Sequence, residues 1–142
     1  MKTLGWKLDY NKFRIYLKEK YQVEVAYLFI GYIPANSDLY RSLQKYGFIL
    51  IFKESMTLPD GKIKGNCDAE LVLQAMIDFQ DYDQAIVVTG DGDFACLIKH
   101  LYNKNKLKLL LVPDKNRYSV LLKKTAKEKI DFISYLKSKL EH

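Results

Sequence analysis

Two aspartates, Asp91 and Asp93, follow an apolar run at residues 86–88 in the segment IVVTGDGDF. Adjacent carboxylates repel each other unless a proton or a cation lies between them. Hard cations such as Mg²⁺ and Mn²⁺ take carboxylate oxygens as ligands. The pair therefore favours a metal site, while the simpler interpretation is that Asp93 caps a helix starting at Phe94. We expect Gly90 and Gly92 to adopt backbone angles that are unfavourable for other residues and so to aim both carboxylates into one cleft.

A second polar group lies upstream, in the segment KIKGNCDAELVLQAM at residues 62–76. It contains Lys64, Asn66 and Asp68, and Asp68 is expected near the start of a helix. An acid in the first turn of a helix also complements the helix dipole, which is the alternative explanation of Asp68. The helix dipole does not explain why Lys64 and Asn66 accompany Asp68 upstream of the two later aspartates.

Several other kinds of site are excluded by the sequence. An EF-hand loop starting at Asp91 would need glycine at its sixth position and glutamate at its twelfth, but this sequence has Cys96 and Tyr102 there. The chain has no DxDxT motif, which a haloacid dehalogenase phosphatase requires, and no GxSxG, GxxxxGK[ST] or GxGxxG motif.

The elements that must position these residues follow from hydrophobic periodicity and from capping signals. Helices are expected at residues 9–21, 36–46, 67–79, 94–103, 120–126 and 134–140, with Asp9 as the first N-cap and Gly47 ending the second helix. Strands are expected at residues 23–32, 48–54, 84–89 and 106–112. This alternation predicts a three-layer α/β/α sandwich with a mainly parallel sheet. In such sheets ligands bind beyond the carboxyl ends of the strands, which is where Asp91 and Asp93 are expected.

Composition sets further limits. The 142 residues are expected to form one domain over residues 1–139, and residues 140–142 resemble the start of a purification tag. No apolar run approaches the roughly 20 residues that span a bilayer, so no membrane association is expected. Cys67 and Cys96 fit neither a CxxC nor a zinc spacing, which favours free thiols and a cytoplasmic location.

Charge is distributed unevenly along the chain. Residues 1–98 hold 11 Lys/Arg and 13 Asp/Glu, a net charge of −2, whereas residues 99–142 hold 12 and 4, a net charge of +8. A basic half beside an acidic cluster is typical of proteins that bind polyanions, and the alternative is a solvated lysine-rich surface.

The two motifs together resemble a known family. KGNCDAELVLQAM followed by YDQAIVVTGDGDFACLI is similar to the NYN domain, in the LabA/DUF88-type branch of the PIN-like nucleases. The pattern there is K-G-x-x-D-x-x-L, an apolar strand and S-G-D-x-D-F, with Thr89 in place of the usual serine. The later segments LLLVPD and LLKKTAKEKIDFISYL also follow that family, so the resemblance covers most of the chain.

The resemblance implies a PIN-like, Rossmann-like fold and a ribonuclease that hydrolyses RNA with Mg²⁺ or Mn²⁺. Asp68, Asp91 and Asp93 would form the metal site, with Lys64, Asn66 and Thr89 as supporting catalytic groups. The basic residues that are candidates for binding RNA are Lys64, Lys115, Arg117, Lys123, Lys124 and Lys127.

One part of the family pattern is missing. The first strand of the family carries an aspartate that contributes to the metal site, whereas this sequence begins with MKTLGWKLDYNKF, which resembles the segment after that strand. Two explanations stay open, a late start of the sequence and a loss of the strand. The alternative function is therefore a catalytically impaired module that binds RNA or protein, or a scaffold with a vestigial acidic pocket. Unpaired strand edges would also favour a homo-oligomer.

Overall fold

A computed structural model describes residues 5–54, 56–57, 59–60, 63–64 and 67–142 of the chain. The chain divides into two compact units, one formed by residues 9–74 and the other by residues 5–8 together with 75–142. The boundary falls within α3 (Asp68–Ile77). Among the described residues, no helix combines the length and the hydropathy needed to cross a bilayer.

The first unit begins with a helix whose ends were predicted from the sequence. Asp9 is extended and its side chain accepts a hydrogen bond from the N–H of Lys12 (3.0 Å), which caps α1 (Tyr10–Tyr21). Gln22 ends the helix in the left-handed conformation, at φ 57°. The predicted N-cap and the predicted end of this helix are therefore confirmed.

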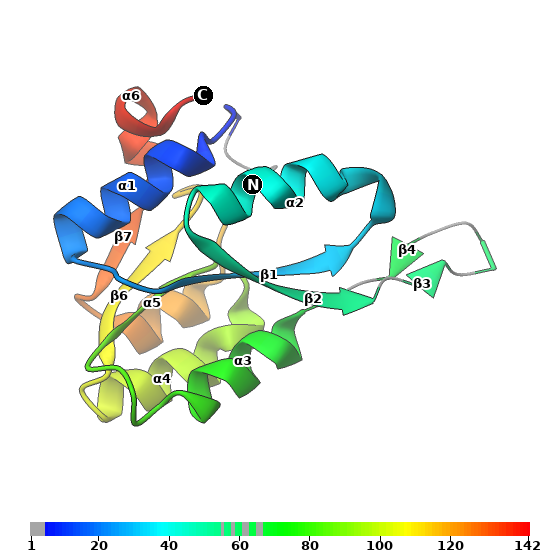
Figure 1. Ribbon diagram of the computed structural model, residues 1–142. Coiled ribbons are helices and arrows are strands. Elements are labelled where there is room, and N and C mark those ends of the chain that lie inside the picture. The colour runs from blue at the N-terminus through cyan, green and yellow to red at the C-terminus, as the bar shows by residue number, and fades with distance from the viewer. Residues whose placement is uncertain (1–4, 55, 58, 61–62, 65–66) are drawn as a thin grey trace. The chain divides into compact units, whose positions relative to one another are not determined.

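A parallel pair of strands follows in the same unit. After α1, this unit continues with β1 (Ala26–Tyr32), η2 (Pro34–Asn36), α2 (Ser37–Lys45), β2 (Phe48–Glu54), β3 (Met56–Thr57) and β4 (Ile63–Lys64). β1 and β2 are parallel, and α2 packs on β2 (Figure 1). Gly47 ends α2 with φ 104°, as the sequence predicted.

β1 begins three residues later than predicted, because a buried arginine forms hydrogen bonds with backbone carbonyls just before the strand. Arg14 is only 8% exposed. Its guanidinium donates to the carbonyl oxygens of Val23 (3.1 Å) and Glu24 (2.9 Å). These carbonyls satisfy the buried cation instead of a strand partner, so regular pairing starts only at Ala26.

The second unit is built on a three-stranded parallel sheet. It contains β5 (Ala85–Val88), η3 (Gly92–Phe94), α4 (Ala95–Asn103), β6 (Leu107–Val112), α5 (Val120–Ala126), β7 (Ile130–Phe132), η4 (Ile133–Leu136) and α6 (Lys137–Leu140). β6 lies between β5 and β7 and is parallel to both. The core is aliphatic, and among the described residues its largest fully buried side chains are Ile98, Leu101, Leu107, Leu110, Leu111, Val112, Leu122, Ile133 and Leu140. Parallel pairing in both units confirms the predicted α/β fold class.

Two features of this unit were absent from the sequence prediction. β7 has only three residues and forms by pairing with β6, where Val112 lies opposite Phe132. At the end of the chain, Glu141 forms an isolated antiparallel bridge with Leu8, and the neighbouring Leu140 is buried. Residues 140–142 therefore contact residues 7–8 within this unit.

Candidate metal centre

The loop at residues 89–93, called the acidic loop below, follows the end of β5 in the second unit. The N–H of Thr89 donates to the carbonyl of Leu111 (3.2 Å), which continues the pairing with β6 by one residue. Because β5, β6 and β7 are parallel, their carboxyl ends lie at one edge of the sheet. The acidic loop therefore leaves the sheet at the edge where ligands bind in open α/β folds.

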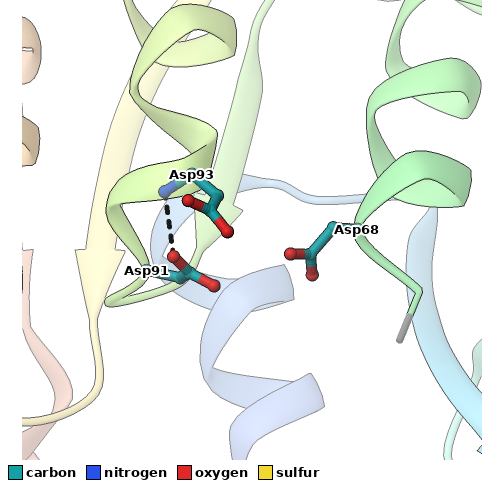
Figure 2. A group of neighbouring side chains, drawn as sticks. All are labelled: Asp68, Asp91 and Asp93. Carbon is teal, nitrogen blue, oxygen red and sulfur yellow. Dashed lines mark hydrogen bonds between the residues drawn. The ribbon is translucent and has the colours of Figure 1, made fainter. Parts of the chain in front are cut away.

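Hydrogen bonds fix the direction of the acidic loop. The hydroxyl of Thr89, a buried residue, accepts from the N–H of Asp91 (3.1 Å). Asp91 Oδ1 in turn accepts from the N–H of Asp93 (2.9 Å), as the dashed line in Figure 2 marks. Both carboxylates are exposed to solvent. The loop thus presents two outward carboxylates from a backbone that is held by side chains.

The capping role falls on Asp91 and not on Asp93, which corrects the simpler interpretation drawn from the sequence. Asp91 is the N-cap of η3, and its carbonyl also accepts from the N–H of Phe94 (3.2 Å). The short η3 turn precedes α4, so the first hydrogen-bonded turn starts before Phe94. Capping therefore explains Asp91 and leaves the side chain of Asp93 unexplained.

The two glycines of the loop, Gly90 and Gly92, allow close packing. The prediction that they adopt backbone angles unfavourable for other residues is wrong. Among the described residues, only Gly5 and Gly47 are glycines with positive φ. A Cβ on Gly92 would lie 2.5 Å from Ser119 Oγ and 2.9 Å from Ser119 Cβ, so no side chain fits there. A Cβ on Gly90 would lie 3.4 Å from the carbonyl oxygen of Arg117.

The segment at residues 114–119, called the basic loop below, packs against the acidic loop. The N–H of Ser119 donates to the carbonyl of Gly90 (3.2 Å), and Ser119 Oγ caps α5. Asp114 closes the turn by accepting from the N–H groups of Asn116 (2.9 Å) and Arg117 (3.1 Å). The predicted RNA-binding residues Lys115 and Arg117 are therefore carried on a loop that contacts the acidic loop.

The other predicted basic residues lie elsewhere in this unit. Lys123 and Lys124 are on α5, in its last turn. Lys127 follows that helix, and its Nζ lies 4.8 Å from the ring centroid of Tyr102, close to the end of α4. α4 starts beside the acidic loop and rises about 1.5 Å per residue, so Tyr102 is roughly 10 Å further along. Lys127 is thus separated from Lys115 and Arg117.

The upstream candidates belong to the first unit. Asp68 is the first residue of α3, is half-buried and shares the first turn with Glu70, whose carboxylate lies 3.8 Å from Lys53 Nζ. The backbone of Lys64 is in β4, opposite Met56. Asn66 lies outside the described residues. Figure 2 draws the side chain of Asp68, which leaves the N-terminal end of α3.

Thiol chemistry is disfavoured beside Asp68. The pKa of the Cys67 thiol is raised, first by burial and then by the negative charge of Glu70. A thiol must lose its proton to ligate a metal or to attack a substrate. The candidate donors are therefore carboxylate oxygens, which suit Mg²⁺ and Mn²⁺.

Comparison with known proteins identifies the family. The family model described as the NYN domain matches residues 1–134. The chain belongs to the NYN domain family. NYN domains are part of the PIN-like nuclease superfamily, whose members typically use divalent metals. The functions of NYN domains usually involve nucleic acids.

A structural comparison finds the same fold in a solved structure. A crystal structure of a protein of unknown function from Vibrio parahaemolyticus matches with a TM-score of 0.74 and 25% identity, over 93% of this chain and 82% of that chain. No curated protein matches the chain. The α/β fold of this NYN domain, with parallel sheets and flanking helices, is therefore shared with a solved structure.

Proposed function

We propose that this NYN domain is a metal-dependent ribonuclease that hydrolyses the phosphodiester bonds of RNA. The observation that carries the proposal is the acidic loop, which presents Asp91 and Asp93 at the carboxyl edge of a parallel sheet in a PIN-like nuclease family. Asp93 in particular is an exposed acid that capping does not explain.

In this proposal Asp68, Asp91 and Asp93 together hold the metal ion. Each residue offers one carboxylate oxygen, and these are the three side chains of Figure 2. Such an oxygen donor set fits Mg²⁺ or Mn²⁺. The bound ion supplies an activated water and neutralises charge on the phosphoryl oxygens.

The remaining site residues orient these carboxylates or bind phosphate. Thr89 keeps Asp91 in place through the 3.1 Å hydrogen bond to its N–H. We assign Lys64 to a phosphate oxygen of the substrate and Asn66 to a supporting polar contact. Lys115 and Arg117 follow the RNA backbone from the basic loop, and the further phosphate contacts are assigned to Lys123, Lys124 and Lys127.

Cleavage of a labelled single-stranded RNA in Mn²⁺ tests the proposal. Asp91→Asn and Asp93→Asn should each lower the rate about 100-fold, because several kcal/mol of charge stabilisation is lost. Asp83→Asn is the matched control, since Asp83 is exposed just before the opposite end of β5. Metal binding is measured independently by electron paramagnetic resonance, which records how the signal of free Mn²⁺ falls as protein is added. Unchanged cleavage by Asp91→Asn would refute the proposal.

The alternative is a catalytically impaired module that binds RNA or protein. It is favoured by the small donor set, because three carboxylate oxygens fill only about half of the octahedral shell that Mg²⁺ demands, which would leave a weak affinity for the ion. The same assay separates the two functions. RNA that is bound by the wild-type domain in Mn²⁺ but never cleaved would support the binding module.

Strand edges that have no partner strand within their own sheet lead to a proposal about assembly. Within the described part of the chain, β1 pairs only with β2, and β5 pairs only with β6. An unpaired edge presents N–H and carbonyl groups to another strand. We propose that two copies pair through such an edge. Light scattering after size exclusion should give the mass of a dimer, and a monomer at every concentration would refute the pairing.

Two finer assignments complete the proposal. We propose that the domain belongs to the LabA/DUF88-type branch, which the paired motifs support, and an enzyme of that branch should share the acid-dependent cleavage described above. Cys67 and Cys96 are both free, which supports a reducing cytoplasmic location. Fractionation of the cells that express the protein tests the location, and recovery outside the cytoplasm would contradict it.

A further inference from the structure

Three aromatic side chains, called the aromatic cluster below, gather in the second unit. Tyr118, on the basic loop, meets Phe132 at the end of β7, with ring centroids 5.3 Å apart. Phe132 in turn meets Tyr135 of η4 at 5.7 Å and nearly at a right angle (84°). Tyr135 is 62% exposed, so the outermost ring of the cluster is largely open to solvent. The cluster is a short row of packed rings with one open end.

The aromatic cluster lies at the same edge of the sheet as the acidic loop. Phe132 is the last residue of β7 and lies opposite Val112, the last residue of β6. Tyr118 Cβ is 3.6 Å from the position that a Cβ on Gly90 would occupy. The row of rings therefore starts against the loop that carries the acids, and it continues to Tyr135 within one unit.

Positive charge and fixed backbone accompany the open ring. Lys115 Nζ lies 4.9 Å from the centroid of the Tyr135 ring. The N–H of Lys115 donates to Ser134 Oγ (3.2 Å), and the N–H of Ser134 donates to the carbonyl of Pro113 (3.0 Å). The basic loop and η4 are thus joined by hydrogen bonds, which fix the backbone that carries Lys115 and leads into Tyr135.

We infer that the aromatic cluster is a stacking platform for the bases of single-stranded RNA, with Tyr135 as the ring that a base contacts. This inference rests on the proposed ribonuclease function. Unpaired bases stack on exposed aromatic rings, and lysine or arginine beside the ring binds the phosphate. Duplex RNA keeps its bases stacked inside the helix, so this surface selects single strands. A base on Tyr135 would lead the strand along Tyr118 toward the acidic loop.

Binding of a fluorescein-labelled single-stranded oligoribonucleotide, measured by anisotropy in EDTA, tests the inference without cleavage. Tyr135→Ala should raise Kd about tenfold, which is the lower part of the range for loss of one stacked base. Tyr135→Trp should restore or improve the affinity, because its ring still stacks. Binding of an RNA duplex should be the same in all three proteins.

Tyr46→Ala is the matched control. Tyr46 is an exposed tyrosine at the C-cap of α2, in the first unit, and no RNA contact is assigned to it or to the residues beside it. This substitution should change Kd for single-stranded RNA less than twofold. Thermal melting of each variant verifies that the fold is kept, as expected for a side chain as exposed as Tyr135.

Three results would overturn the inference. They are a Kd that Tyr135→Ala leaves unchanged, an equal loss of affinity for duplex RNA, and a wild-type domain that binds no RNA. The proposed function fails in a different way, namely when Asp91→Asn cleaves RNA as fast as the wild type. Cleavage that depends on Asp91 but is indifferent to Tyr135 would therefore refute the stacking platform alone.

Discussion

The contact between Gly92 and Ser119 leads to a sharp prediction about stability. A Cβ on Gly92 would lie 2.5 Å from Ser119 Oγ and 2.9 Å from Ser119 Cβ, whereas carbon atoms prefer about 3.5–4.0 Å. The hydroxyl can rotate away, but Ser119 Cβ cannot, because it moves only with the backbone. That backbone is tied to the acidic loop by the 3.2 Å hydrogen bond from the N–H of Ser119 to the carbonyl of Gly90.

Gly92→Ala should therefore destabilise the domain by about 2–4 kcal/mol. Overpacking of this kind costs about 1–3 kcal/mol, and rotation of the Ser119 hydroxyl would add about 1 kcal/mol by removing the cap of α5. For a chain of this size the melting temperature should fall by about 5–10 °C. Because Asp91 and Asp93 flank Gly92, the affinity for Mn²⁺ should fall as well.

A double-mutant cycle in urea, followed by circular dichroism, isolates this contact. Ser119→Gly removes both offending atoms and by itself costs only a few tenths of a kcal/mol at an N-cap. Combined with Gly92→Ala, it should recover more than about 1 kcal/mol of the loss. Gly90→Ala is the control and should cost less, because its nearest neighbour lies at 3.4 Å. Additive free-energy changes for the two substitutions would refute the reasoning.

Three further predictions concern other parts of the chain. Arg14→Met should lower the free energy of unfolding in urea by about 3 kcal/mol, because the backbone carbonyls that now accept from the buried guanidinium would lose their donor. An equally stable variant would contradict this. Cys96 should be alkylated before Cys67, as intact-protein and peptide mass can follow, because Cys96 is exposed and burial raises the pKa of Cys67; the reverse order would be inconsistent with it. The pKa of Glu128 is lowered by its own backbone N–H and then by the Tyr102 hydroxyl, so Tyr102→Phe should raise it in an NMR titration. Since the folded pKa is the lower one, this carboxylate stabilises the fold above its unfolded pKa, and the contribution disappears as the pH falls through the folded pKa.

The sequence alone determined the features that depend on neighbouring residues. The cap at Asp9, the left-handed Gly47 and the limits of β2 and α5 follow from side chains within a few positions of each other. The spacing of Asp91 and Asp93 after an apolar strand likewise indicated their place at the carboxyl end of β5. These are local effects, in which capping and hydrophobic periodicity act over one or two turns.

Tertiary structure decided the features that depend on residues far apart in the chain. Arg14 shortens β1 by binding carbonyls that follow α1, and β7 exists because β6 supplies its hydrogen bonds.

The acidic loop shows the same limit at the candidate site. Gly92 is required by Ser119, which comes 27 positions later in the sequence and meets it only after the β6 crossover. Sequence spacing contains no signal for such a contact, because close packing depends on where the crossover returns the chain. The position of the two aspartates could therefore be predicted from the sequence, whereas the packing of the loop that holds them in place depends on the tertiary structure.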